Sequence, residues 1–111
     1  MPDCVIIVEG RRDRDRLLPL LRERVEVVCT YGVPTHERLL QIAARAREAD
    51  VAIFTDNDRA GKRIRGILSD EFPDALHLHT KAEYGGVETT PLDYLQQLLV
   101  RHDLALESKS C

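Results

Sequence analysis

Short apolar runs alternate along the chain with longer stretches in which apolar residues recur every three or four positions. The runs are rich in valine and isoleucine and cover residues 5–8, 25–29 and 51–54, with a weaker run at 75–79. The longer stretches carry the apolar stripes Leu17, Leu18 and Leu21; Leu39, Leu40, Ala43 and Ala46; Ile64, Ile67 and Leu68; and Leu92, Leu95, Leu98 and Leu99. Strands that alternate with helices predict an α/β fold with a central parallel sheet of about four strands, flanked by helices and joined by right-handed crossovers.

Proline and capping residues indicate where two of the helices begin. Pro19 would break a long first helix and is easier to accommodate if that helix begins near Asp15, a boundary that stays open. The last helix has Thr90 as a candidate cap, Pro91 at its first position, and Asp93 to complete a capping-box pattern. We therefore expect the last helix to begin at Pro91.

The length of 111 residues is typical of one domain, because a second hydrophobic core would need more chain. We expect a domain over residues 1–102 and a C-terminal tail over residues 103–111 that frays. With 43% apolar and 32% charged residues, the composition is that of an ordinary globular protein. No apolar run approaches the ~20 residues that span a bilayer, and the N-terminus lacks a signal-type pattern. The expected location is therefore the cytoplasm, with no membrane partner.

The three cysteines, Cys4, Cys29 and Cys111, are odd in number and lack the spacing of metal ligands. Cys4 and Cys29 lie in or beside apolar strands, where cysteine behaves as a small apolar residue. Buried reduced thiols are therefore favoured over a disulfide.

Acidic residues follow the first and third predicted strands. The first strand is followed by Glu9 and Gly10, and the third is followed by a segment that contains Asp56, Asp58 and Gly61. In doubly wound sheets ligands bind beyond the carboxyl ends of the strands, so these carboxylates are candidate site residues. The spacing of two puts Asp56 and Asp58 on one side of an extended chain. Three carboxylates without a nearby Cys or His form an oxygen-only site that suits Mg²⁺ or Mn²⁺ rather than zinc.

Gly61 should let the chain turn tightly into the next helix, whose N-terminal amides favour a phosphate. Basic residues crowd the segments that follow the two acidic motifs: Arg11, Arg12, Arg14 and Arg16, and then Arg59, Lys62, Arg63 and Arg65. By itself, each group is more typical of a solvated helix face. The net charge of −3 does not exclude a nucleic-acid partner, because phosphate binding depends on the local field. Of these residues, Arg11, Arg12, Lys62 and Arg63 are the candidates for phosphate contacts.

Two other kinds of acidic site, the EF-hand Ca²⁺ loop and the phosphate-accepting receiver domain, share part of this pattern. Asp56, Asp58 and Gly61 match positions one, three and six of an EF-hand Ca²⁺ loop. The match then fails, because Ala60 and Ile67 stand where ligands are required and a strand precedes the loop. A phosphate-accepting receiver domain shares the fold class, but its first strand would end in an acidic pair, so it remains a minor alternative.

Taken together, these motifs resemble the signature of the Toprim family. Val8-Glu9-Gly10 with Asp13, followed by Asp56-x-Asp58 with Gly61, stand at the ends of the expected strands, and the resemblance covers roughly residues 4–80. The chain is similar to the domain shared by type IA and type II topoisomerases, bacterial primases, overcoming-lysogenization-defect nucleases and small rRNA-maturation nucleases. The resemblance implies a Rossmann-like Toprim fold and the Mg²⁺-assisted making or breaking of phosphodiester bonds in DNA or RNA.

The resemblance also implies roles for single residues. Glu9 would act as general acid or base, and Asp56 and Asp58 would hold Mg²⁺ or Mn²⁺ against the phosphate, with Glu9 as a possible third ligand. Gly10, Asp13 and Gly61 belong to the motif and are additional candidate site residues. The activity expected of the isolated protein is cleavage or nicking of nucleic acid. The alternative is a non-catalytic subunit that binds nucleic acid or a protein partner, or forms a homo-oligomer, within an assembly.

Residues outside the motif carry weaker expectations. A topoisomerase needs a separate domain for its nucleophilic tyrosine, and a chain of this length has no room for one. Tyr94 lies in the last amphipathic helix and Tyr31 at a strand-end turn, so packing is the expected role of both, while that of Tyr84 stays open. The segment 84–91 should be a flexible loop, in which Glu88 is either a further site acid or a solvated residue. Its Gly-Val-Glu also resembles the small rRNA-maturation nucleases. His77 and His79 lack a third ligand and are expected to be exposed.

Overall fold

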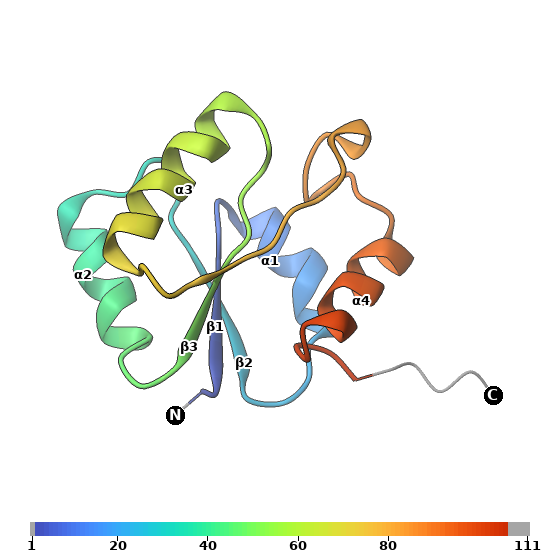
Figure 1. Ribbon diagram of the computed structural model, residues 1–111, viewed down its shortest axis with the longest axis horizontal. Coiled ribbons are helices and arrows are strands. Elements are labelled where there is room, and N and C mark those ends of the chain that lie inside the picture. Colours follow the sequence, from blue (N-terminus) through green and yellow to red (C-terminus); the bar gives the residue numbers. More distant parts are fainter. Residues whose placement is uncertain (1, 107–111) are drawn as a thin grey trace.

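A parallel sheet with the strand order β2-β1-β3-β4 lies at the centre of the protein (Figure 1). The computed structural model describes residues 2–106. Its strands are β1 (Cys4–Val8), β2 (Val25–Cys29), β3 (Asp50–Ile53) and β4 (Leu76–His77). All the pairings are parallel, and Cys4 of β1 lies opposite both Val25 and Asp50. The predicted α/β fold with a four-stranded parallel sheet is thus confirmed.

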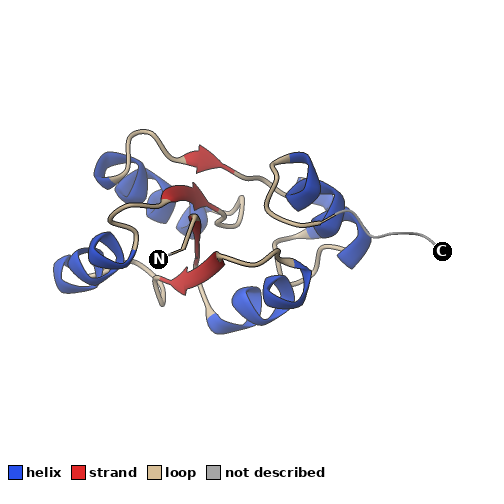
Figure 2. Ribbon diagram, turned by 90° about the horizontal axis from the view of Figure 1, so that it is seen from below, coloured by secondary structure: helices blue, strands red, loops and turns tan. Residues whose placement is uncertain are grey.

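Helices cover both faces of this sheet (Figures 1 and 2). They are α1 (Arg11–Leu17), α2 (His36–Arg45), α3 (Arg59–Glu71) and α4 (Leu92–Arg101), with short 3₁₀ helices at Leu18–Leu20 and Ala82–Tyr84. One buried cluster joins the sheet to α1 and α4, and the other joins it to α2 and α3. The strand order reverses between β1 and β3, and this reversal is where doubly wound folds bind their ligands.

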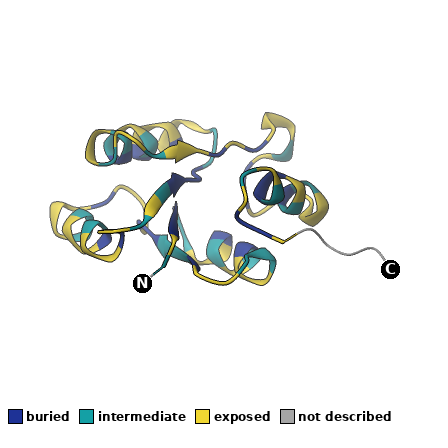
Figure 3. Cartoon of the chain, turned by 60° about the horizontal axis from the view of Figure 1, so that its bottom comes forward, coloured by how far each residue is buried: buried dark blue, intermediate teal, exposed yellow. Residues whose placement is uncertain are grey.

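The central strand β1 supplies both clusters. Ile6 and Val8 pack with α1 and α4, whereas Val5 and Ile7 pack with α2 and α3, as the alternation of side chains along a strand requires. Every residue of β1 is buried, which explains why its sequence is a continuous apolar run. Figure 3 shows buried residues along the central strand and the inner helix faces, and exposed residues on the outer faces.

The start of the first helix, which the sequence left open, lies earlier than the position near Asp15. Helix α1 begins at Arg11, because Gly10 is its N-cap and Asp13 takes the third helical position of a capping arrangement. The α-helix ends at Leu17, and Pro19 lies within the following 3₁₀ turn, where its missing N–H is tolerated. The proline therefore limits the C-terminal end of the helix and leaves its start unaffected.

The expected cap of the last helix was wrong. Helix α4 begins at Leu92, its N-cap is Pro91, and no side chain caps it. The buried Thr90 hydroxyl instead donates a hydrogen bond to the carbonyl oxygen of Gly86. Asp93 accepts a hydrogen bond from the backbone N–H of Tyr94. Thr90 thus stabilises the loop that precedes α4.

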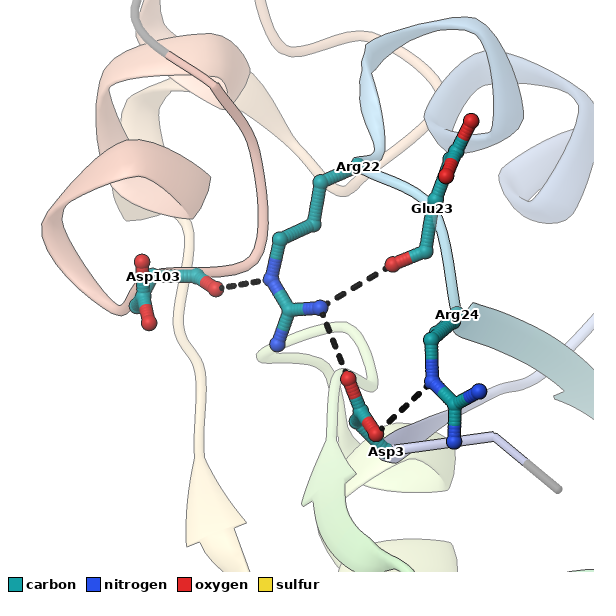
Figure 4. A network of polar contacts seen from close by, with 5 residues as sticks. All are labelled: Asp3, Arg22, Glu23, Arg24 and Asp103. Carbon is teal, nitrogen blue, oxygen red and sulfur yellow. Dashed lines mark hydrogen bonds and ion pairs between the residues drawn. The ribbon is translucent and has the colours of Figure 1, made fainter.

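Residues 103–105 do not fray as expected. Leu104 and Ala105 are buried in the core. The N–H of Arg22 donates to the carbonyl of Leu104 over 3.0 Å, and its side chain binds the carbonyl of Asp103 over 2.7 Å and Asp3 over 3.3 Å (Figure 4). Residues 107–111 of the expected tail lie outside the described residues. The expectation of fraying was therefore wrong for residues 103–105, and the domain boundary at residue 102 stays a prediction.

Two smaller expectations are confirmed. Cys4 and Cys29 are buried and free, and burial, followed by the charge of Asp50, raises the pKa of the Cys4 thiol to about 11. His77 and His79 are exposed. The third cysteine, Cys111, lies outside the described residues. None of the helices between residues 2 and 106 is long and apolar enough to cross a membrane.

Candidate functional site

The acidic residues lie at the carboxyl ends of β1 and β3, where the strand order reverses. Glu9 follows β1 directly, and Asp56 lies three residues beyond β3. A carboxylate oxygen of Glu9, Oε2, accepts a hydrogen bond from the backbone N–H of Asp56 over 2.7 Å. The two acidic motifs, 47 positions apart in the sequence, are therefore in direct contact.

Asp56 is enclosed by two glycines. Its Oδ1 accepts a hydrogen bond from the N–H of Val87 over 3.0 Å. A Cβ atom on Gly86 would lie 2.7 Å from that same oxygen, and one on Gly61 would lie 2.0 Å from the Asp56 carbonyl oxygen. Gly61 lies in the first turn of α3, and only a residue without a side chain allows the backbone of Asp56 to approach it this closely.

Asp58 is the N-cap of α3. Its Oδ1 accepts a hydrogen bond from the N–H of Gly61 over 2.7 Å, as capping aspartates do. The carboxylates of Asp56 and Asp58 therefore bind different backbone amides. Within residues 2–106, no three Asp, Glu, His or Cys side chains are arranged to hold a metal ion by themselves. The oxygen-only donors fit Mg²⁺ or Mn²⁺ in chemical character, and an ion here would need water or phosphate oxygens to complete its coordination.

Asp13 is the acid most withdrawn from water in this region. Its side chain accepts a hydrogen bond from the N–H of Gly10 over 3.2 Å, and the residue is 8% exposed. Burial, followed by the charge of Asp56 and then that of Glu88, raises the pKa of Asp13 to about 6 against the opposing effect of the hydrogen bond. Gly10 has an ordinary extended backbone with room for a Cβ, so its conformation does not require glycine.

Glu9 also has a raised pKa. Partial burial is the largest cause, and the charges of Asp56, Asp58 and Asp13 add to it, while the hydrogen bond from Asp56 opposes it. These four acids therefore form one electrostatically coupled group. Like charges in such proximity destabilise one another unless protons or cations neutralise them.

Arg65 holds the strand ends behind this group of acids. Its guanidinium donates hydrogen bonds to the carbonyls of Ile53, Thr55 and Leu78 over 3.2, 3.0 and 2.7 Å. Its charge also interacts with Glu9. In the sequence, Arg65 belongs to a group of basic residues that is typical of a solvated helix face. Its position four residues after Gly61, on the sheet-facing side of α3, is the signal that could have distinguished it.

The loop before α4 is tied to α1. Arg12 forms an ion pair with Glu88 over 3.1 Å, and the Arg16 guanidinium donates to the carbonyls of Glu88 and Thr90. Together with the hydrogen bond from Val87 to Asp56, these contacts hold a segment that we expected to be flexible. The pattern of basic residues did not predict this use of Arg16, and a site role for Glu88 stays a prediction.

The candidate phosphate-binding residues lie on both sides of the acids. Arg11, Arg12, Lys62 and Arg63 are exposed in the first two turns of α1 and α3. Both helices begin at the same edge of the sheet but pack on opposite faces of it (Figure 1). Basic side chains therefore flank the acidic group from two directions.

The tyrosines differ in their surroundings. Tyr94 packs edge-to-face against Tyr84 with ring centroids 5.4 Å apart, so its expected packing role is confirmed. Tyr31 is 58% exposed, which contradicts the packing expected for it. Its backbone leaves the β2 strand in a left-handed conformation that turns the residue outward.

Comparisons with known proteins identify relatives of this chain. Uncharacterized protein YusF of Bacillus subtilis (strain 168) is 34% identical, over 96% of this chain and 76% of the relative. Ribonuclease M5 of Lactiplantibacillus plantarum is 31% identical over 90% of this chain, and that of Mycoplasma mycoides is 34% identical over 60% of it. The chain spans only 66% and 38% of these two enzymes.

A solved structure extends the similarity to the whole fold. The small TOPRIM domain protein from Bacillus stearothermophilus superposes with a TM-score of 0.86 at 34% identity, over 96% of this chain and 91% of that one. A family model described as Toprim-like matches residues 6–84, which include Glu9, Asp56 and Asp58. The resemblance found in the sequence motifs is thus confirmed, and the chain belongs to the Toprim-like family.

Proposed function

We propose that this protein is a Mg²⁺- or Mn²⁺-dependent nuclease that cleaves or nicks nucleic-acid phosphodiesters. The observation that carries the proposal is the contact between the two acidic motifs, in which Glu9 Oε2 lies 2.7 Å from the Asp56 nitrogen at the reversal of the strand order. The similarity to proteins named ribonuclease M5 supports a nucleic-acid substrate.

The proposed roles follow from the surroundings of each acid. Asp56 and Asp58 would bind the ion together with water and a phosphate oxygen, and the bound ion would neutralise phosphate charge and acidify a water molecule. Glu9 would transfer a proton during phosphodiester cleavage or act as a third ligand of the ion. Its raised pKa supports proton transfer, because such an acid holds its proton closer to neutral pH than an ordinary glutamate.

The first test is cleavage by the purified protein with Mg²⁺ or Mn²⁺ against an EDTA control. Plasmid DNA, single-stranded DNA, single-stranded RNA and duplex RNA are the substrates to compare. Asp56→Asn and Asp58→Asn should abolish metal-dependent cleavage, while Asp70→Asn, an exposed change at the far end of α3, should leave it unchanged. If both variants cleave at the parental rate, the proposed metal site is wrong.

The role of Glu9 needs a separate measurement. If Glu9 transfers a proton, Glu9→Gln should bind Mn²⁺ as the parent does, while single-turnover cleavage slows by roughly 10²-fold or more. Asp56→Asn should instead lose Mn²⁺ affinity first, as measured by calorimetry. Equal loss of Mn²⁺ binding in both variants would assign Glu9 as a ligand, and an unchanged cleavage rate would remove it from the reaction.

Phosphate contacts can be counted from the dependence of binding on salt. Replacing all four candidate residues, Arg11, Arg12, Lys62 and Arg63, with alanine should weaken binding. Each lost contact should reduce the log–log salt slope by about 0.7–0.9. A variant with the parental slope would show that these side chains are only a solvated surface.

A second candidate function is a non-catalytic subunit that binds nucleic acid or a partner protein. Glu9, Asp56 and Asp58 each already accept a backbone hydrogen bond, and the described chain holds no arranged group of three metal ligands. These observations favour a site completed by another molecule. Salt-dependent binding to nucleic acid, without cleavage under any metal condition, would favour this function over the nuclease.

A further inference from the structure

Tyr31 is an exposed aromatic residue next to the acidic group. It lies just beyond β2, and its backbone N–H donates a hydrogen bond to the carbonyl of Glu9 over 2.8 Å. The preceding N–H, that of Thr30, donates to the carbonyl of Val8 over 2.9 Å. Tyr31 is nonetheless 58% exposed. The ends of β1 and β2 therefore hold its backbone beside Glu9 while leaving much of its side chain accessible.

The backbone of Tyr31 has a conformation that tyrosine rarely adopts. Its φ is 57°, and that of Gly32 is 88°, so two consecutive residues lie in the left-handed region. Asparagine and glycine tolerate this region better than a bulky aromatic residue does. Core packing does not explain the strained tyrosine, because the residue is largely exposed. Unfavourable backbone conformations of this kind are concentrated in binding and catalytic sites.

Arg38 fixes the position of the ring. The guanidinium carbon of Arg38 lies 5.3 Å from the centroid of the Tyr31 ring, within the range of a cation–π contact. The same guanidinium donates two hydrogen bonds to the carbonyl of Cys29, over 2.9 and 2.7 Å, so it is itself anchored to the end of β2. An aromatic ring held in this way loses little conformational freedom when a second flat group stacks on it.

We propose that Tyr31 is a stacking platform for one unpaired base of the nucleic acid whose phosphate reaches the acidic group. This inference rests on the proposed function and adds to it that the substrate is single-stranded or locally unpaired. Sites for single strands combine basic residues that follow the backbone with aromatic rings that stack on bases. Here Arg11 and Arg12 supply exposed charge just after Glu9, and Tyr31 supplies the ring.

The test uses variants that separate the ring from the backbone strain. Tyr31→Asn removes the ring but suits the left-handed backbone, and Tyr31→Phe keeps the ring. Val33→Ala is the matched control, because it trims another exposed apolar side chain of the same loop. Binding is measured in EDTA by fluorescence anisotropy, with labelled single-stranded RNA, single-stranded DNA, a perfect duplex, and a strand that lacks bases.

Tyr31→Asn should bind one or both single strands roughly 5- to 150-fold more weakly than the parent, the range expected for one stacked base. Tyr31→Phe and Val33→Ala should bind like the parent. Duplex binding and the salt slope should be unchanged in Tyr31→Asn, since no phosphate contact is lost. If Tyr31→Asn loses affinity for only one of the two single strands, RNA or DNA, that nucleic acid supplies the stacked base. The fluorescence of a single strand that contains 2-aminopurine should be quenched by the parent and by Tyr31→Phe, and much less by Tyr31→Asn.

Contrary results separate this inference from the proposed function. If the parent binds single strands and Tyr31→Asn binds them equally well, the platform is wrong and the nuclease proposal stands. An equal loss of duplex binding also overturns the platform. If the parent binds no nucleic acid, both proposals are wrong. Should Tyr31→Asn fail to fold, the parent must still prefer the normal strand to the strand without bases, and equal binding of the two overturns the platform.

Discussion

The titration of Asp13 should make the stability of this protein fall between acidic and neutral pH. Burial, with the charges of Asp56 and Glu88, raises the pKa of Asp13 from 3.8 to about 6 in the folded protein. Because the folded state binds this proton more tightly than the unfolded chain, Asp13 adds stability below its unfolded pKa. That stability is lost as the pH rises through about 6. A shift of about 2 units corresponds to about 3 kcal/mol as an upper value.

Asp13→Asn removes the titrating group and keeps an acceptor for the Gly10 N–H. The variant also gives up a favourable charge in the first turn of α1, which offsets about 0.3–1 kcal/mol of the gain. We therefore expect Asp13→Asn to be more stable than the parent by about 1–3 kcal/mol near pH 8, and to show no gain near pH 4. For a domain of this size, each kcal/mol raises Tm by about 4 °C.

Urea denaturation at several pH values measures this effect, with the midpoint and the slope fitted separately. Asp15→Asn is the matched control, because it removes the same charge from the same helix at a side chain that is 60% exposed. The control should change stability by less than about 1 kcal/mol at every pH. A gain from Asp13→Asn that does not depend on pH, or a loss near pH 8, would refute the assigned electrostatics.

Three further changes test the contacts around the site. Gly86→Ala should displace the Asp56 carboxylate from the Val87 N–H, which should lower the free energy of unfolding by only about 1 kcal/mol but clearly weaken Mn²⁺ binding. The control Gly66→Ala, in open space on α3, should raise the free energy of unfolding by about 0.5–1 kcal/mol. Unchanged Mn²⁺ binding in the first variant would mean that Asp56 does not bind the ion. Arg65→Met should lower the free energy of unfolding by about 2–3 kcal/mol, since it removes the donor to the carbonyls of Thr55 and Leu78 and one of the two donors to that of Ile53. A neutral result by urea denaturation would contradict that role. Arg22→Met should lower the free energy of unfolding by about 1 kcal/mol and lower the protection from hydrogen exchange at residues 103–105. Unchanged protection there would show that the Arg22 side chain does not hold this segment.

Much of the fold could be predicted because hydrophobic periodicity is a local property of the chain. The continuous apolar run of β1 indicated a strand buried on both faces, and the stripes of α2 and α3 indicated helices that cover the sheet. The ends of elements were harder to predict, since a cap depends on single hydrogen bonds. Thr90 matched the pattern of a cap, but its hydroxyl binds Gly86 instead.

The candidate site divides in the same way. The sequence by itself determined that Glu9, Asp56 and Asp58 follow strands, and parallel strands bring their carboxyl ends to one edge of the sheet. Only the tertiary structure decided which groups those carboxylates contact: Asp56 meets Val87, 31 positions away, and the Glu88 carbonyl meets Arg16, 72 positions away. Such contacts depend on the order of strands and the path of loops, and periodicity encodes neither of these.

The direction of single side chains was likewise decided by the tertiary structure. Arg65 and Arg63 look alike in the sequence, yet Arg65 turns toward strand carbonyls while Arg63 is exposed, because α3 presents only one side to the sheet. Tyr31 is apolar enough to pack, but a left-handed turn after β2 directs it outward. Residue type and spacing determined which segments form strands and helices and which edge of the sheet carries the acids. The three-dimensional packing of those segments determined which polar groups meet there.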